Sequence, residues 1–256
     1  DVDVAFGGAV AEEGSAPVDV SRQSQGPALD AEFSKAVADV DLAFGGAVAA
    51  EEALAVVDVA LETTVAEGPA LDAEKSKELG ISAAYVHRCF PDEARSAAGA
   101  DNPNFYDLCK VLAVGPQGRG YGHLCPRDGR LNCSFVDAVG PEWHGKATHF
   151  VSWCWKYTME DVVDALGVWM QGPDCRNRTD LFLWMCWFCN NQCRIVEDGS
   201  RTGSDDLKAI FESQLHAAGH MLVILDSFME PHYFSRAWCL FETYVCIEKQ
   251  YPRKLL

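Results

Sequence analysis

Two contrasting patterns stand next to each other between residues 148 and 170: Thr148-His-Phe-Val-Ser-Trp-Cys154 and, four residues later, Met159-Glu-Asp-Val-Val-Asp-Ala-Leu-Gly-Val-Trp-Met170. The first stretch is rich in β-branched and aromatic residues, which favour a β-strand. The second repeats its apolar residues at the spacing of one helix face, namely Met159, Val162, Val163, Leu166 and Met170. Together they predict a strand over 148–154 and a helix over 159–170.

The same order returns twice along the chain. Residues 180–188 form a nearly unbroken apolar run, typical of a strand buried on both faces, and a helix is expected from Ser204 over 204–215. A third strand is predicted over 220–226 and a third helix over 233–249. Such alternation predicts an α/β fold, a three-layer α/β/α sandwich with a mainly parallel, flavodoxin-like sheet.

In a parallel sheet, ligands approach the carboxyl ends of the strands and the loops that follow them. Here those loops cover 152–157, 189–203 and 226–232. Ser152 and Trp153 after the first strand, and Asp226 and Ser227 after the third, are therefore candidate binding residues. The alternative for Asp226 is a structural role, capping the helix that follows.

The start of the third helix, Ser235-Arg-Ala-Trp-Cys-Leu-Phe-Glu242, resembles the S-x-W-C-L-x-E signature of TIR (Toll/interleukin-1 receptor homology) domains, with one more residue between Ser and Trp. The resemblance covers roughly residues 147–250. Cys154-Trp-Lys-Tyr157 stands where those domains carry residues similar to Arg-Gly-Asp. A full TIR domain also continues through two more strands, so either the middle segment supplies substitute strands or the chain is a divergent or shortened version.

The resemblance implies two functions. The first is a signalling or assembly module that binds a protein partner or itself, such as an accessory subunit of a larger complex. The second is an NAD glycohydrolase, in which NAD is the substrate and no cofactor or metal is required. For that activity the resemblance assigns the catalytic carboxylate to Glu242 and a stacking surface to Trp238, and residues four apart do share one helix face.

Residues 80–146 form a turn-rich middle segment. Strands are predicted at 109–114 and 133–139, giving a possible β-hairpin, with Gly118, Gly120 and Gly122 as its glycine-rich connection rather than a phosphate loop. Three arginines, Arg119, Arg127 and Arg130, form a locally basic patch that could meet an acidic partner or balance the acidic residues of this chain.

Residues 1–79 form an acidic arm with 17 Asp and Glu against 4 Lys and Arg, a net charge of −13. Asp1-Val-Asp-Val-Ala-Phe-Gly-Gly-Ala-Val10 returns as Asp39-Val-Asp-Leu-Ala-Phe-Gly-Gly-Ala-Val48. The arm is interpreted as a partly helical linker or as a docking segment that becomes ordered on a partner. The total charge of −17 argues against nucleic acid and anionic membranes as partners.

All 11 cysteines lie from Cys89 onward. Their odd number favours an intracellular, reducing compartment, the cytoplasm or an organelle reached by a targeting peptide since removed, because the chain begins at Asp1. The longest apolar run is too short to span a bilayer. Cys186, Cys189 and Cys193 have a spacing that could hold a metal, but burial as free thiols is the favoured interpretation and no metal is predicted.

Overall fold

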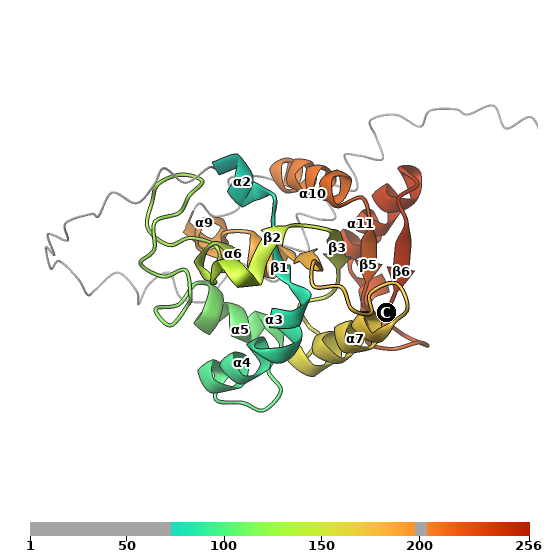
Figure 1. Ribbon diagram of the computed structural model, residues 1–256, viewed down its shortest axis with the longest axis horizontal. Helices are drawn as coiled ribbons and strands as arrows, with labels where there is room; N and C mark the ends of the chain where they lie inside the picture. Colours follow the sequence, from blue (N-terminus) through green and yellow to red (C-terminus); the bar gives the residue numbers. More distant parts are fainter. Residues whose placement is uncertain (1–72, 198–203) are drawn as a thin grey trace, which may run out of the picture.

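The computed structural model describes residues 73–197 and 204–256 (Figure 1). A mixed six-stranded sheet runs through this part of the chain in the order β2-β1-β4-β3-β5-β6. The strands are β1 (Leu79–Ser82), β2 (His144–Lys146), β3 (His149–Ser152), β4 (Phe182–Trp184), β5 (Met221–Val223) and β6 (Arg253–Leu255). The chain therefore has the α/β character that its alternating pattern predicts.

Four neighbouring strands of the sheet, β4, β3, β5 and β6, are parallel. β3 lies inside this parallel group. The next strand along the chain, β4, is on one side of it, and β5 and β6 are on the other. The direction of winding therefore reverses between β3 and β5. In open α/β sheets this reversal is the place where ligands bind, at the carboxyl ends of the two strands.

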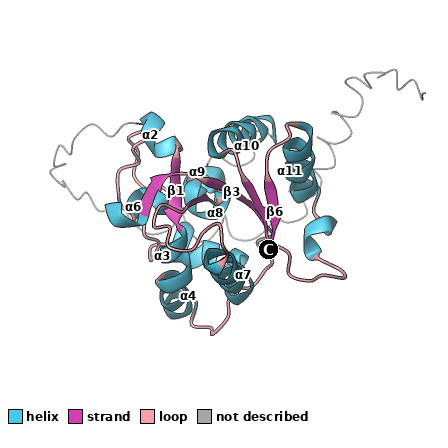
Figure 2. Ribbon diagram, turned by 45° about the vertical axis from the view of Figure 1, so that its right-hand side comes forward, coloured by secondary structure: helices cyan, strands magenta, loops and turns pink. Residues whose placement is uncertain are grey.

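Helices connect the parallel strands. α7 (Met159–Gln171) follows β3, and its first turn is closed by a capping box between Thr158 and Asp161. α8 (Cys186–Cys189), α9 (Gln192–Glu197) and α10 (Ser204–Ala218) follow β4, and α11 (Ala237–Glu248) joins β5 to β6. In Figures 1 and 2, α10 and α11 lie on one side of the strands and α7 lies on the other with α3 (Ala83–Arg88) and α4 (Phe90–Ala98).

The three strand–helix units are confirmed, with two changes in their bounds. The apolar run 180–188 is a strand only over β4, and the chain turns into α8 directly after Met185. The helix expected over 233–249 is interrupted: a 3₁₀ turn, His232–Ser235, comes first, and α11 begins after Arg236. Continuous apolar sequence does not distinguish a buried strand from a buried helix, which explains the first difference.

In the middle segment the strand predictions are wrong. Residues 109–114 are helical, with α5 (Phe105–Leu108) running into a π-helical segment, Cys109–Ala113. Residues 133–139 contain α6 (Phe135–Ala138). The segment does contribute strands elsewhere, because β1 pairs antiparallel with both β2 and β4 and so extends the sheet beyond the parallel part.

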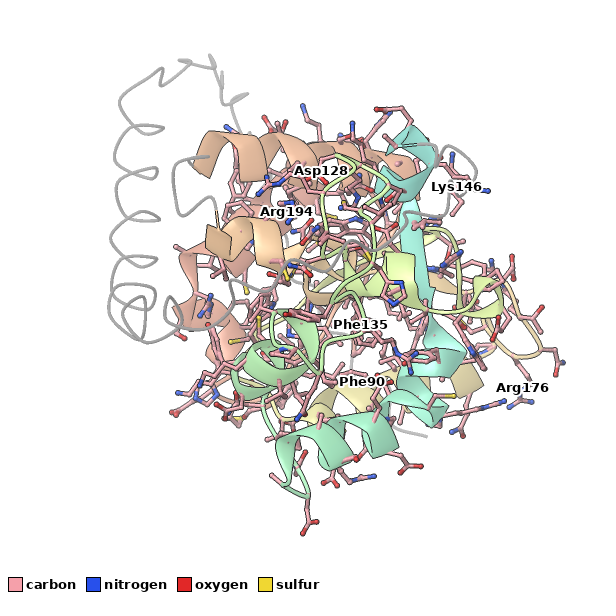
Figure 3. All side chains as sticks on the ribbon, turned by 90° about the vertical axis from the view of Figure 1, so that its left-hand side faces the viewer. Phe90, Asp128, Phe135, Lys146, Arg176 and Arg194 are labelled. Carbon is pink, nitrogen blue, oxygen red and sulfur yellow. The ribbon has the colours of Figure 1, made fainter. Side chains whose placement is uncertain are left out.

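An aromatic cluster explains why these short segments are helical. Phe90, Phe105 and Phe135 come from α4, α5 and α6, and Phe90 and Phe135 are labelled in Figure 3. The Phe90 ring lies 5.9 Å from Phe105 and 6.1 Å from Phe135. The same ring lies 4.9 Å from Phe188 of α8. Burying several large rings in one place stabilises the helices that carry them. This stabilisation outweighs the local preference of these residues for a strand.

The first 72 residues lie outside the described part of the chain, so the linker and docking interpretations of the arm stay predictions. The last residues of the predicted arm, 73–79, belong to the described part of the chain. α2 (Ala73–Lys77) precedes β1, and Ser76 is buried, donating a hydrogen bond of 2.6 Å to Asp137 and accepting one of 2.9 Å from Arg127. None of the helices in the described ranges is long and apolar enough to cross a membrane.

Candidate functional site

A buried polar chain lies where β3 ends, beside the reversal of strand order. Ser152 is the last residue of β3, Tyr233 lies in the 3₁₀ turn before α11, and Glu242 lies on α11. The Ser152 hydroxyl donates to Glu242 Oε2 and lies 2.5 Å from the Tyr233 hydroxyl. Tyr233 in turn donates to the backbone oxygen of Cys239 at 3.0 Å. One hydrogen-bonded path therefore joins β3, the 3₁₀ turn and α11.

Burial makes Glu242 a weak acid. Only 4% of the residue is exposed, and desolvation raises its pKa to about 8, although hydrogen bonds from Ser152 and Trp238 and the charge of Arg236 oppose the shift. A protonated Glu242 donates to the Ser152 hydroxyl instead of accepting from it, and the hydroxyls of Ser152, Tyr233 and Thr243 can reorient to complete the path.

Trp238 and Glu242 share one side of α11, as their spacing predicts, but they do not border an open cleft. The indole of Trp238 is half-buried, with ring centroids 6.3 Å from Phe211 of α10 and 5.7 Å from Phe241. Its ring is thus part of the packing between α10 and α11.

Trp153 is also part of the interior. Its ring meets Phe105 edge to face at 4.2 Å, and its carbonyl accepts a hydrogen bond from the Cys239 thiol at 3.6 Å. Burial raises the pKa of Cys239, which leaves that thiol protonated. Neither the ring nor the thiol is placed to react with a ligand.

Asp226 and Ser227 follow β5 in a more exposed loop. Asp226 accepts a hydrogen bond from the backbone N–H of His232 at 3.0 Å and a second from its imidazole. Partial burial opposes ionisation of Asp226, yet these hydrogen bonds hold its pKa below the usual value. Ser227 accepts a bond from the N–H of Glu230 at 3.3 Å. Both side chains shape the loop that leads to the 3₁₀ turn.

The middle segment covers the loop that follows β3. The backbone N–H of Phe105 donates to the carbonyl of Trp155 at 3.1 Å, and Tyr106 packs on the Trp155 ring at 5.8 Å. The hydroxyl of Tyr106 accepts a hydrogen bond of 2.5 Å from Arg236, just before α11. The residues that close the carboxyl end of the sheet therefore come from two distant parts of the chain.

Two cavities in the described part of the molecule lie elsewhere. One, of about 540 Å³, lies between α7 and residues 254–256; its lining includes the apolar Val168 and Leu256 and the charged Asp164 and Lys254. The other, of about 450 Å³, lies where β3, β5 and β6 begin and includes His149, His220 and Arg253. Glu242 lines neither of them. Burial lowers the pKa of His149 to about 4, helped by the nearby His220 and Arg178.

The cysteine triplet is divided among separate partners. Cys186 Sγ accepts from the Trp155 indole at 3.3 Å, while the thiols of Cys189 and Cys193 point to the carbonyls of Leu183 and Ala113. Burial raises the pKa of both Cys186 and Cys189 to about 12. Within residues 73–197 and 204–256, no three His, Cys, Asp or Glu side chains are grouped to hold a metal ion.

The predicted basic patch is also partly neutralised. Arg119 forms an ion pair with Glu93 at 2.8 Å, and Arg127 donates to the carbonyl of Cys189 at 2.8 Å. In the connecting loop, a Cβ on Gly120 would lie 2.1 Å from the Cys133 carbonyl, so glycine is needed there for close backbone packing. This agrees with a structural role for the glycines, although they do not join two strands of a hairpin.

Three residues of the site were not predicted: Tyr233, Tyr106 and Arg236. In the sequence, Tyr233 is only the first residue of a predicted helix. Nothing in the pattern indicates that its hydroxyl lies beside Ser152, which bridges it to Glu242. Tyr106 and Arg236 are 130 positions apart, and local periodicity carries no information about such a contact.

No protein-family model, curated protein or solved structure matches this chain.

Proposed function

We propose that the folded part of this chain is a TIR-like assembly module that associates with a second copy of itself through α11 and the loop before it. Parallel strands in the order β4-β3-β5-β6, with helices on both sides, support the finer assignment to a three-layer TIR-like or flavodoxin-like sandwich. The 11 free thiols support the proposal that it works in a reducing compartment.

The observation that carries the proposal is an apolar stripe on the outside of α11. Leu240, Tyr244 and Ile247 follow one another at intervals of four and three residues, and Tyr244 is 61% exposed. The opposite side of α11 is apolar too, and it is buried against the sheet and α10. A helix that is apolar on both sides is expected to have both of them covered, so a partner is needed for the outer one.

The loop between β5 and α11 adds exposed apolar side chains to the surface formed by α11. Phe228 is 95% exposed and Met229 is 81% exposed, and Phe234 is exposed on the 3₁₀ turn. Aromatic and methionine side chains are enriched in protein interfaces, where they bury a large area without leaving unpaired polar groups. The apolar stripe and these loop residues belong to one continuous stretch of chain.

Sedimentation of the full chain over a range of concentrations tests self-association. We expect wild-type protein to form dimers or larger species that dissociate on dilution, and we expect the double variant Leu240→Glu/Ile247→Glu to stay monomeric. Leu131→Glu is the matched control, because Leu131 is also an exposed apolar residue but lies in the middle segment and not on α11. A wild-type chain that stays monomeric, or variants that all associate equally, would exclude the proposal.

NAD cleavage is the second candidate, because Glu242 has a strongly shifted pKa and lies at the reversal of strand order, where such folds bind ligands. Two observations weigh against it. A neutral carboxyl group cannot stabilise the positive charge that develops on ribose. The hydroxyls of Ser152 and Tyr233 also occupy the space that a substrate would need.

A further inference from the structure

The outer edge of β6 has backbone groups free to pair with another strand. In the described sheet β6 pairs only with β5, through bonds such as Met221 N–H to the Pro252 carbonyl at 2.9 Å and Leu256 N–H to the Val223 carbonyl at 2.8 Å. Because strand backbone groups alternate in direction, the N–H and C=O groups of Arg253 and Leu255 point away from β5. Such an edge is a template for an added strand.

The two faces of this edge differ in chemistry. On one face, the cavity of about 540 Å³ between α7 and β6 offers the apolar surfaces of Val168 and Leu256. On the other face, Arg253 lies close to Cys246 of α11. Burial raises the pKa of the Cys246 thiol, and the positive charge of Arg253 opposes this rise. Arg253 forms no ion pair within the described residues, whereas the neighbouring Lys254 lies 3.5 Å from Asp174.

The acidic arm contains a segment that matches both faces. Asp39-Val-Asp-Leu42 alternates acidic and apolar residues, so as a strand it would have both carboxylates on one face and both apolar side chains on the other. The same alternation opens the chain at Asp1-Val-Asp-Val4. Around it, residues 1–79 carry a net charge of −13, which favours approach to a cationic edge.

We infer that residues 39–42 of the arm add as a strand to the free edge of β6, with an aspartate beside Arg253 and Val40 and Leu42 over the cavity between α7 and β6. The backbone groups of Arg253 and Leu255 then complete their hydrogen bonds with the arm. This is recognition by strand addition, in which main-chain bonds supply affinity and alternate side chains supply specificity. It covers the edge and fixes the arm to the folded part of the same chain.

The length of the arm permits this contact. Residues 43–72 join the segment to α2, and about 30 extended residues reach about 100 Å. The four strand spacings from β1 to β6 amount to only about 20 Å. The connection is also short enough to hold the segment at a high effective concentration, and residues 39–42 have a shorter connection than residues 1–4.

A second copy of β6 is a poorer occupant. An antiparallel pair of β6 strands centred on Lys254 would place the two lysines directly opposite each other, and like charges in that position are destabilising. Basic residues on an edge strand are a common means of preventing such self-pairing. The same residues attract an acidic strand.

Amide hydrogen exchange, measured by NMR on the ¹⁵N-labelled full chain, tests the inference. In wild-type protein we expect the amides of Arg253 and Leu255 to exchange at least about tenfold more slowly than in Asp39→Asn/Asp41→Asn, because removing the two charges releases the strand. Glu51→Gln/Glu52→Gln removes the same charge from another part of the arm and is the matched control. Leu222 in the central β5 should exchange equally in all proteins.

Charge reversal provides a second measurement. Arg253→Glu should raise the exchange rate of the Leu255 amide, and combining it with Asp39→Lys/Asp41→Lys should restore slow exchange. Equal exchange at Leu255 in wild type and Asp39→Asn/Asp41→Asn would overturn the inference. So would protection of Leu255 that rises with protein concentration in the Leu240→Glu/Ile247→Glu background, in which association through α11 is removed, since that result would identify a second copy of β6 as the occupant.

Discussion

Ser152 and Glu242, 90 positions apart in the sequence, are joined by a buried hydrogen bond between the end of β3 and the middle of α11. Glu242 is a neutral acid in this position, since its pKa is raised to about 8. The pair holds the third connecting helix against the central strand of the parallel sheet. It occupies the place where a ligand would bind in many folds of this class, which makes its chemistry directly testable.

The first prediction concerns the pH dependence of stability. Glu242 has a pKa of about 8 when folded and an ordinary value of 4.5 when unfolded, so the folded chain holds a proton that the unfolded chain releases. This stabilisation is complete below the unfolded value and is lost as the pH rises through 8. Between the two values the free energy of unfolding should fall by up to about 1.4 kcal/mol per pH unit.

Urea unfolding of wild type and Glu242→Gln across this pH range checks the prediction. Glutamine is neutral at every pH, so the stability of the variant should depend less steeply on pH than that of wild type. All other titratable groups are common to both proteins, so their contributions cancel in the comparison. Two parallel curves would show that Glu242 ionises normally in the folded chain.

The second prediction concerns the hydroxyl of Tyr233. It lies within hydrogen-bond distance of Ser152, the Cys239 carbonyl and, at 2.8 Å, Thr243. Tyr233→Phe leaves these buried partners without it and should lower the free energy of unfolding by about 1–3 kcal/mol. Tyr121→Phe, at an exposed position in the middle segment, should change stability by less than about 0.5 kcal/mol. Equal effects in chemical denaturation would argue against a buried hydrogen-bonded path.

The third prediction concerns the contact between the middle segment and α11. Tyr106→Phe removes the acceptor for the half-buried Arg236 and should destabilise the chain by about 1–3 kcal/mol. It should also make the Trp155 loop more accessible, which quenching of tryptophan fluorescence by acrylamide would detect. Tyr121→Phe is the control, since Tyr121 is exposed in the same segment. If quenching increases equally in both variants, Tyr106 does not close this end of the sheet.

The fourth prediction concerns NAD. Because Glu242 is neutral and covered, the purified full chain should release no nicotinamide from NAD above the rate without protein. Chromatographic assay of nicotinamide with wild type and Glu242→Gln checks this. Release by wild type that is lost in Glu242→Gln would establish the glycohydrolase and exclude the structural role assigned here to the carboxyl group.

Local periodicity was sufficient to predict a helix or strand where the element has one clear apolar pattern over enough residues. The alternation around Phe150 and the helical spacing from Met159 to Met170 correspond to β3 and α7. The helix beginning at Ser204 and the strand before Asp226 are also found, as α10 and β5. In each case the apolar residues that define the pattern are those that the sheet and helices bury against one another.

The secondary structure of short apolar segments was decided by tertiary packing. Residues 109–113 and 135–138 are compatible with strands by composition, but they are helical because their aromatic and aliphatic side chains join the cluster around Phe90. β6 was missed because Arg253-Lys-Leu255 has no apolar alternation and is a strand through its bonds to β5. Backbone pairing across a sheet is a long-range property, and three residues do not specify it.

The sequence by itself determined the alternation of strands and helices, the acidic arm and the placement of Trp238 and Glu242 on one side of a helix, because periodicity and charge are local properties of the chain. Only the tertiary structure decided the strand order, and with it that Glu242 lies against Ser152, which in turn contacts Tyr233. The reason is physical: the pKa and accessibility of a side chain depend on what is packed around it, and the groups around Glu242 come from elements far apart in sequence.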